Sequence, residues 1–164
     1  MDAPVVVFVG LGANLGDAVH TLREALRELD ALPGTHLLRA SRLYRTPAWG
    51  VQAQPDFINA VAMLETTLPA RALLDALLAV ERAHGRDRAR ETRWGPRTLD
   101  LDLLVYGDAD IDEPGLRVPH PHLHERAFVL LPMAEIAPDV VLPGAGRVRE
   151  LAVAMAGDGI EAIG

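Results

Sequence analysis

The sequence contains no cysteine and no lysine, since all sixteen of its basic residues are arginine. The absence of cysteine excludes disulfides, zinc–thiolate sites and thiol nucleophiles. The absence of lysine excludes a Walker-type lysine and a Schiff-base lysine. No apolar run approaches the ~20 residues of a membrane span, and the first ten residues lack the basic region of a signal peptide. We therefore expect a cytoplasmic protein that does not associate with a membrane.

The formal net charge of −7 argues against a nucleic-acid-binding protein, because such proteins are usually basic. The basic residues are nevertheless clustered. Six arginines lie within sixteen positions: Arg82, Arg86, Arg88, Arg90, Arg93 and Arg97. With 164 residues of ordinary soluble composition, the chain is expected to form a single domain over residues 1–164.

Strand and helix patterns alternate along the first two thirds of the chain. Strands are expected at 5–11, 37–44, 57–64 and 98–106, and helices at 17–32 and 69–84. The order strand, helix, strand, strand, helix, strand is that of the split βαβ or ferredoxin-like fold, an α+β arrangement with an antiparallel sheet. Further helices are expected within 120–137, interrupted by Pro132, and at 147–156. The prediction is a three-layer α/β/α arrangement, with 107–115 turn-like and the last eight residues loosely held.

The run from Arg93 to Asp102, Arg-Trp-Gly-Pro-Arg-Thr-Leu-Asp-Leu-Asp, combines two chemistries. Arginines bind phosphate oxygens in a planar fork, and paired carboxylates hold a hard divalent cation. Asp100 and Asp102 alternate with leucines in a predicted strand, so both carboxylates point to the same side. The alternative is an exposed sheet face with two ordinary acids. The adjacent Arg93 and Arg97 favour a magnesium site for a metal-bound polyphosphate.

The segment before this strand carries most of the clustered arginines. Such a run is usually a solvated surface, where Asp87 and Glu91 could pair with the arginines. The segment also joins a helix to the acidic strand, and Gly85 and Gly95 could give it the flexibility of a lid that closes over phosphates.

Two other motifs have simpler interpretations. Gly10-x-Gly-x-x-x-Gly16 is close to the dinucleotide-binding fingerprint, but its third glycine falls one position late, and a tight strand-to-helix turn is the better interpretation. His120, His122 and His124 alternate like metal ligands, but no further ligand is nearby in sequence. We reject a zinc site there and keep His120 as a candidate phosphate contact.

Aromatic residues are scarce, with two Trp, two Tyr and three Phe. Phe57 and Phe128 could simply belong to the core. Asn59, however, is a polar residue two positions after Phe57 on the same strand face. An aromatic ring beside an amide is suited to stacking and hydrogen-bonding a flat heterocycle.

Together these stretches resemble the 6-hydroxymethyl-7,8-dihydropterin pyrophosphokinase family of folate biosynthesis. The matching segments are Gly12–Asp17, Tyr44–Pro47, Gln54–Asn59, Arg93–Tyr106, Val118–Pro121 and Arg126–Phe128. The resemblance implies an ATP-dependent diphosphotransferase that moves the β,γ-diphosphate of ATP to the pterin hydroxymethyl group and releases AMP. It implies two Mg²⁺ ions as cofactors, bound through Asp100 and Asp102, with ATP as co-substrate.

The resemblance also implies a role for each matched site residue. Arg86 and Arg97 join Asp100 and Asp102 as catalytic residues. The nucleotide site is implied at Leu74, Arg88, Arg93, Trp94, Leu103, His120, Pro121 and Arg126. The pterin pocket is implied at Thr46, Pro47, Trp49, Phe57, Asn59 and Phe128, with the ring between the two phenylalanines. Glu81 matches a further position on the ATP side.

The sequence departs from the family pattern at a few positions. Ala13 replaces a frequent serine, Phe57 replaces a tyrosine of some members, and Gly115 and Arg117 stand where other members carry Arg and Thr. The role of Arg90 is left open, because the loop is one residue longer than in some relatives.

The expected partners are the two small-molecule substrates alone. The chain is expected to be a monomer and to bind neither nucleic acid nor a membrane. Two alternatives compete with this prediction. The first is a non-catalytic ferredoxin-like module that binds RNA through its arginines, which net acidity and the aspartate pair oppose. The second is a nicotinamide oxidoreductase built on the glycine motif.

Overall fold

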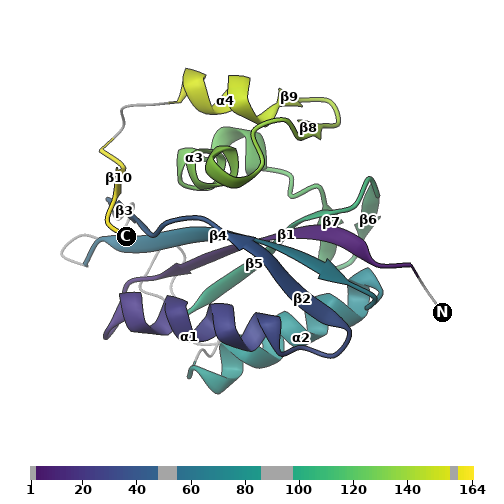
Figure 1. Ribbon diagram of the computed structural model, residues 1–164, viewed down its shortest axis with the longest axis horizontal. Coiled ribbons are helices and arrows are strands. Elements are labelled where there is room, and N and C mark those ends of the chain that lie inside the picture. The colour runs from purple at the N-terminus through teal and green to yellow at the C-terminus, as the bar shows by residue number, and fades with distance from the viewer. Residues whose placement is uncertain (1–2, 48–54, 86–97, 156–158) are drawn as a thin grey trace.

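The computed structural model describes residues 3–47, 55–85, 98–155 and 159–164. An antiparallel six-stranded sheet lies between two layers of helices (Figure 1). Helices α1 (Ala18–Asp30) and α2 (Ala70–Ala83) cover one face, and α3 (Ala127–Ile136) and α4 (Val148–Ala154) lie over the other. The predicted ferredoxin-like core and the three-layer α/β/α arrangement are confirmed.

The sheet is built around β1 (Val5–Ala13), which pairs with β4 (Phe57–Thr66) on one side and β5 (Asp100–Tyr106) on the other. Strands β2 (Thr35–Ala40) and β3 (Tyr44–Thr46) pair in turn with β4. Strand β10 (Glu161–Ala162) extends the sheet beyond β3. Strand β5 is thus an edge strand of the sheet, and α2 packs against it.

Helices α1 and α2 form because their leucines recur at helical spacing and bury one stripe against the sheet. Leu22, Leu29, Leu73 and Leu77 are fully buried in one core cluster with the β1 residue Val9. The side chain of Asp17 accepts a hydrogen bond from the backbone N–H of His20, capping α1 at its first turn. The predicted helices are confirmed, each beginning within a residue or two of the expected position.

The opposite face of the sheet forms a second core cluster with α3 and α4, in which Phe8, Val61 and Leu104 are buried. The Tyr44 hydroxyl donates a hydrogen bond to the Glu135 carboxylate, which ties β3 to α3. Burial, assisted by the neighbouring Glu135 carboxylate, raises the pKa of Tyr44. Tyr44 therefore stays a neutral donor and holds β3 in place beneath α3.

Two expectations for the middle of the chain were wrong. The single strand predicted at 37–44 is two strands, because the chain leaves the ladder at Ser41, whose side chain accepts a hydrogen bond from the Val61 N–H. The segment 107–115, predicted to be a turn, contains the first strand of a hairpin, β6 (Ile111–Glu113). The second strand, β7 (Leu116–Val118), follows it and pairs with β6. Its short strands carry too little apolar alternation for the sequence pattern to reveal them.

Two expectations for the C-terminal part were also wrong. Pro132 does not interrupt α3, which runs through it with Pro132 buried inside the helix. The described end of the chain is not loosely held, because the Ile163 N–H donates to the Leu43 carbonyl at 2.8 Å and Glu161 pairs with Arg45 at 2.9 Å. The remaining short elements are a 3₁₀ turn at Leu123–Glu125, β8 (Val141–Leu142) and β9 (Gly146–Arg147).

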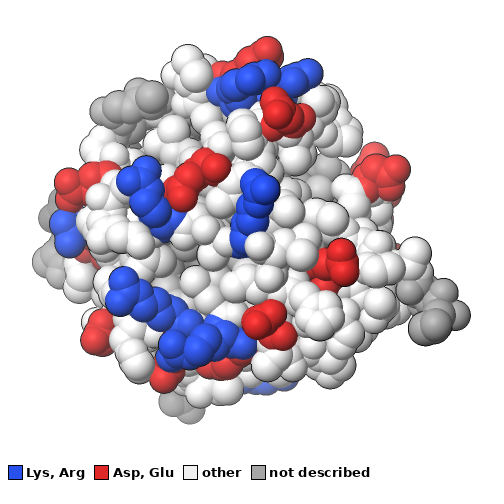
Figure 2. Space-filling model, in the orientation of Figure 1, with Lys and Arg blue, Asp and Glu red and all other residues white. Residues whose placement is uncertain are grey.

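Basic and acidic side chains are interspersed over the face shown in Figure 2. Among the described residues they form ion pairs such as Arg42–Glu135 at 3.5 Å and Arg149–Asp139 at 3.3 Å. The described helices include none with the length and apolar character needed to cross a bilayer.

Candidate active site

The two aspartates of the Arg93–Asp102 run lie at the start of edge strand β5. Asp100 and Asp102 are partly exposed, whereas Leu101 and Leu103 between and after them are buried in the core beneath the sheet. The side-chain alternation of a strand accounts for this division. The expectation that both carboxylates share one face is confirmed, and that face is the one opposite α1 and α2.

Glycines stand directly opposite both carboxylates. In the β1–β5 register, Gly12 pairs with Asp100 and Gly10 pairs with Asp102. Opposite residues of an antiparallel pair project to the same face, so the strand beside the aspartates carries no side chain that would cover them. Both glycines lie inside β1, not in a turn, and only Gly16 of the motif has a positive φ, of 63°. The turn interpretation of Gly10 and Gly12 was therefore wrong.

A buried amide lies on the other side of Gly12. Asn59 of β4 pairs with Gly12 in register, and its Oδ1 is 2.7 Å from the position that a Cβ of residue 12 would occupy. The Asn59 amide nitrogen donates to the Thr46 hydroxyl at 2.8 Å, and both side chains are buried. A row of positions thus crosses four strands, running from Thr46 of β3 through Asn59 of β4 and past Gly12 of β1 to Asp100 of β5.

The predicted pterin residues of β3 and β4 are adjacent to this row. Phe57 is half-buried at the start of β4 and pairs with Thr46, and Pro47 follows Thr46 directly. The side chain of Asn14, which is buried after β1, donates to the Pro55 carbonyl at 3.0 Å and so fixes the approach to Phe57.

The other predicted stacking residue lies on α3. Phe128 is half-buried at the beginning of this helix, and the Arg126 guanidinium carbon is 5.6 Å from the centre of its ring. Phe57 and Phe128 belong to the same side of the sheet, because Asn59 and Val61 continue the Phe57 face and Val61 packs in the cluster of α3. A pterin ring held between them stays a prediction.

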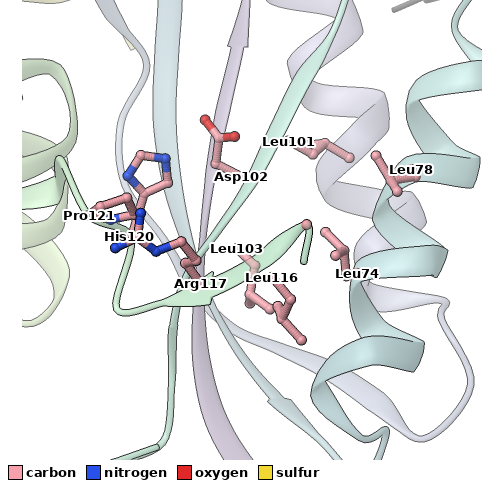
Figure 3. Close-up of a pocket in the computed structure, with 10 residues that line it drawn as sticks. Leu74, Leu78, Leu101, Asp102, Leu103, Leu116, Arg117, His120 and Pro121 are labelled. Atoms are coloured by element: carbon pink, nitrogen blue, oxygen red, sulfur yellow. The ribbon is translucent and has the colours of Figure 1, made fainter. Parts of the chain in front are cut away.

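A cavity of about 450 Å³ opens beside Asp102, between α2, β5 and β7 (Figure 3). Five leucines contribute its apolar wall: Leu74, Leu78, Leu101, Leu103 and Leu116. Its polar lining comes from Asp102, His120 and Arg117. Cavities of this size and composition typically hold a small organic ligand. The cavity thus combines an apolar wall with polar and charged groups at one side.

Four of the predicted nucleotide residues line this cavity: Leu74, Leu103, His120 and Pro121. Gly115 and Arg117 line it as well, although they depart from the family pattern. Leu78 and Leu116 could not be predicted as lining residues, because an apolar residue on a helix or strand is normally part of the core. Arg126 does not line the cavity, but its charge acts on His120.

His120 is a neutral donor facing this region. Burial, followed by the positive charge of Arg126, lowers the pKa of His120 to about 4. Its Nδ1 accepts a hydrogen bond from the His122 backbone N–H at 3.2 Å, so the proton of the neutral ring is on Nε2. The His120 backbone N–H donates to the Leu104 carbonyl at 2.8 Å, which anchors the residue to β5. The ring can thus donate to a phosphate oxygen without carrying a charge.

A buried glutamate holds the strand between the two aspartates. Glu81 of α2 is only 1% exposed, and its Oε2 accepts a hydrogen bond from the Leu101 backbone N–H at 2.7 Å. This contact satisfies a donor on the open edge of β5. The family resemblance implies a position on the ATP side for Glu81, and that role stays a prediction.

Several predicted site residues lie outside the described part of the chain. These are Trp49, Arg86, Arg88, Arg90, Arg93, Trp94 and Arg97. Their roles stay predictions. The described part of the candidate site consists of residues on β1, β3, β4, β5, α2 and α3 and of the segment around His120.

The family model described as 7,8-dihydro-6-hydroxymethylpterin-pyrophosphokinase (HPPK) matches residues 8–138. A 2-amino-4-hydroxy-6-hydroxymethyldihydropteridine pyrophosphokinase of Pseudomonas aeruginosa is 46% identical over 155 residues, covering 94% of this chain and 94% of the relative. The enzyme of the same name from Haemophilus influenzae is 44% identical, covering 90% of this chain and 91% of the relative. That of Methylorubrum extorquens is 44% identical, covering 95% and 97%.

The fold is also similar to solved structures of longer, fused chains. Wild-type HPPK-DHPS of Plasmodium falciparum with pteroate superposes with a TM-score of 0.77 at 12% identity, covering 99% of this chain and 48% of that chain. HPPK-DHPS in complex with substrates gives a TM-score of 0.75 at 10% identity, covering 98% and 46%. This chain spans about half the length of these fused proteins, and the similarity concerns the fold alone.

Proposed function

This chain belongs to the 7,8-dihydro-6-hydroxymethylpterin-pyrophosphokinase family, and we propose that the sheet face around Asp100 and Asp102 is its catalytic centre. The activity is transfer of diphosphate from ATP to 6-hydroxymethyl-7,8-dihydropterin in folate biosynthesis. The main observation in support of this location is that both aspartates pair with glycines in the β1–β5 register. The two glycines leave the sheet surface beside the aspartates free of their own side chains. This surface lies between the cavity next to Asp102 and the Asn59 amide.

The aspartate pair fits Mg²⁺ in its chemistry. Magnesium prefers oxygen ligands, takes one or two protein carboxylates and completes its shell with water and substrate phosphates. Asp100 and Asp102 supply two carboxylates on one face, and the hydrogen-only side chains of Gly10 and Gly12 leave space for phosphates beside them. We propose that these aspartates hold two Mg²⁺ ions. When bound, the ions neutralise the triphosphate and polarise the phosphorus that is attacked.

The nucleotide is proposed to lie in the cavity between α2, β5 and β7. Leu74 and Leu103 supply apolar surface for the base, and Pro121 borders it. His120 then donates through Nε2 to a phosphate oxygen, and Arg126 and Arg117 add positive charge on the same side. The arginines implied by the family resemblance, Arg86, Arg88, Arg93 and Arg97, are proposed to contact the phosphates together with Trp94.

The pterin is proposed to lie over β3 and β4. Its flat ring would stack between Phe57 and Phe128, with Trp49 and Pro47 at its border. Asn59 and Thr46 already share a hydrogen bond of 2.8 Å, which fixes the direction of the Asn59 carbonyl oxygen. That oxygen faces the space over Gly12, where it can accept from the amino and ring N–H groups of a pterin. Two buried, mutually oriented groups would favour a heterocycle that satisfies their hydrogen bonds.

The reaction then requires positioning more than acid–base catalysis. The hydroxymethyl oxygen of the pterin attacks the β-phosphorus of ATP. The bond from that phosphorus to the oxygen bridging the α-phosphate breaks, AMP leaves with the bridging oxygen, and the hydroxyl proton is released. With the acceptor over Gly12 and the donor beside Asp102, as proposed, the attacking and leaving oxygens would align across the β-phosphorus.

The product distinguishes this activity from an ordinary kinase. With ATP, Mg²⁺ and 6-hydroxymethyl-7,8-dihydropterin, the purified chain is expected to give AMP and the pterin diphosphate in equal amounts, and chelation of Mg²⁺ should stop the reaction. Formation of ADP, or no turnover by folded protein, would contradict the activity. A monomer is proposed, and sedimentation with both substrates present is the corresponding measurement.

A further inference from the structure

A cluster of histidine and glutamate side chains lies at the edge between α1 and α2, on the face of the sheet opposite the aspartates. His20, Glu24 and Glu28 follow one another at four-residue spacing along α1 and so lie on one side of that helix. His84 is the C-cap of α2, and its ring reaches across to α1. Helices α1 and α2 lie side by side beneath the sheet (Figure 1).

The ligand-type atoms of this cluster are already close together. His84 Nε2 is 2.6 Å from a carboxylate oxygen of Glu28, and His20 Nε2 is 3.0 Å from one of Glu24. One ligand atom from each of Glu24, Glu28 and His84 lies within 4.8 Å of the other two. Within the described ranges, no arginine forms an ion pair with either carboxylate. Among the described residues, the ion-pair partners of these two glutamates are therefore imidazoles.

We propose that Glu24, Glu28 and His84 form a binding site for a divalent transition-metal ion of the zinc class, with His20 as a fourth ligand. Imidazole and carboxylate together suit Zn²⁺, Co²⁺ or Ni²⁺, whereas Mg²⁺ prefers oxygen ligands alone. The site is thus chemically different from the aspartate pair and takes no part in the transfer reaction.

The present geometry needs only side-chain adjustment to accept such an ion. Zinc bonds of about 2.0–2.1 Å in a tetrahedral site place ligand atoms roughly 3.3 Å apart. The His84–Glu28 separation of 2.6 Å must open, and the other ligand atoms, which already lie within 4.8 Å of one another, must move to this spacing. The Glu24 and Glu28 side chains are 41% and 39% exposed and can rotate, whereas the His84 side chain is only 14% exposed. His84 is therefore the fixed ligand, and the glutamates move toward it.

Calorimetric titration of the full chain with ZnCl₂ tests the site, after chelator treatment and with excess Mg²⁺ present to occupy the aspartates. One zinc per chain is expected, and saturating zinc should raise the melting temperature by roughly 5–10 °C. The double variant Glu24→Gln, Glu28→Gln should bind zinc at least about tenfold more weakly and lose this rise. His20→Ala should have a smaller effect of the same sign.

The controls separate this site from other histidines. His36→Ala, an exposed histidine on β2, and the double variant His122→Ala, His124→Ala should retain the zinc affinity. Because His84→Ala removes a nearly buried ring, the exposed glutamate variants decide the question, with diphosphate transfer in Mg²⁺ as a check that each is folded. Unchanged zinc affinity in the double glutamine variant would overturn the proposal, as would loss of binding only in the His122, His124 variant.

Discussion

The Oδ1 atom of Asn59 occupies the space in which a side chain of residue 12 would begin, 2.7 Å from the position of a Cβ on Gly12. Real Cβ atoms do not approach an oxygen so closely, so the amide and the glycine depend on each other. Asn59 keeps its orientation through the Thr46 hydroxyl, and Gly12 keeps the adjoining surface open toward Asp100. At this contact the proposed pterin pocket adjoins the proposed magnesium site.

Gly12→Ala should therefore displace the Asn59 amide. We expect kcat/KM for the pterin to fall at least about tenfold because its hydrogen-bonding partner moves, and the free energy of unfolding to fall by about 1–3 kcal/mol from overpacking. Steady-state kinetics and urea unfolding measure the two effects. Gly10→Ala is compared for its pterin KM alone, which should stay close to that of the wild type, because its new Cβ lies nearest the Leu104 side chain at 3.5 Å and not beside Asn59. Equal pterin KM values in both variants would contradict the role of the Gly12–Asn59 contact.

Replacing either aspartate should abolish the transfer reaction while the fold is retained. For Asp100→Ala and Asp102→Ala we expect kcat/KM to fall by about 10³-fold or more, because charge neutralisation of the triphosphate is lost. Circular dichroism should be unchanged, since both side chains lie on the partly exposed face of β5. Asp110→Ala, an exposed acid after the strand, should remain active. Activity retained in both site variants would remove the metal assignment.

Glu81 should prove to be a positioning residue for β5. In Glu81→Ala the Leu101 N–H loses its acceptor, and an unsatisfied buried donor costs about 1–3 kcal/mol. We expect a lower free energy of unfolding and a higher Mg²⁺ concentration for half-maximal activity. Glu81→Gln keeps an acceptor oxygen and should recover most of the Mg²⁺ affinity. If the glutamine variant requires as much Mg²⁺ as the alanine variant, the glutamate acts through its charge and not through the strand.

His120 should make the stability of the protein depend on pH below neutrality. Its pKa is lowered to about 4 in the folded chain, against an ordinary value of about 6.5. Between these values the unfolded chain binds a proton that the folded chain does not, so stability is fully present above about pH 6.5 and is lost as the pH falls toward 4. Because the ring is partly exposed, we expect the free energy of unfolding to fall by about 1–2 kcal/mol over this pH range.

The measurement is urea unfolding at a series of pH values, with His120→Asn as the comparison. The variant should lack this part of the pH dependence between pH 6.5 and 4. Its KM for ATP should also rise while its KM for the pterin stays close to that of the wild type. Parallel pH profiles for the two proteins would show that His120 is protonated in the folded chain.

Much of the fold follows from local patterns. The leucine spacing of α1 and α2 and the alternation of Asp100 and Asp102 with leucines depend on helix and strand periods, which act over a few residues. The patterns failed where a long-range partner decides the structure. Pro132 stays within α3 because the helix is buried against the sheet, and the chain end is ordered by its pairing with β3.

The sequence by itself determined which chemistry the protein carries: a carboxylate pair on one strand face, a surplus of arginine before it, and an aromatic residue beside an amide. Only the tertiary structure decided that Gly10 and Gly12 lie opposite the aspartates and that Glu81 supports the strand between them. It also decided that His84 meets Glu28 across two helices. The physical reason is that register and helix packing join residues far apart in the chain, and no local spacing encodes which of them become neighbours.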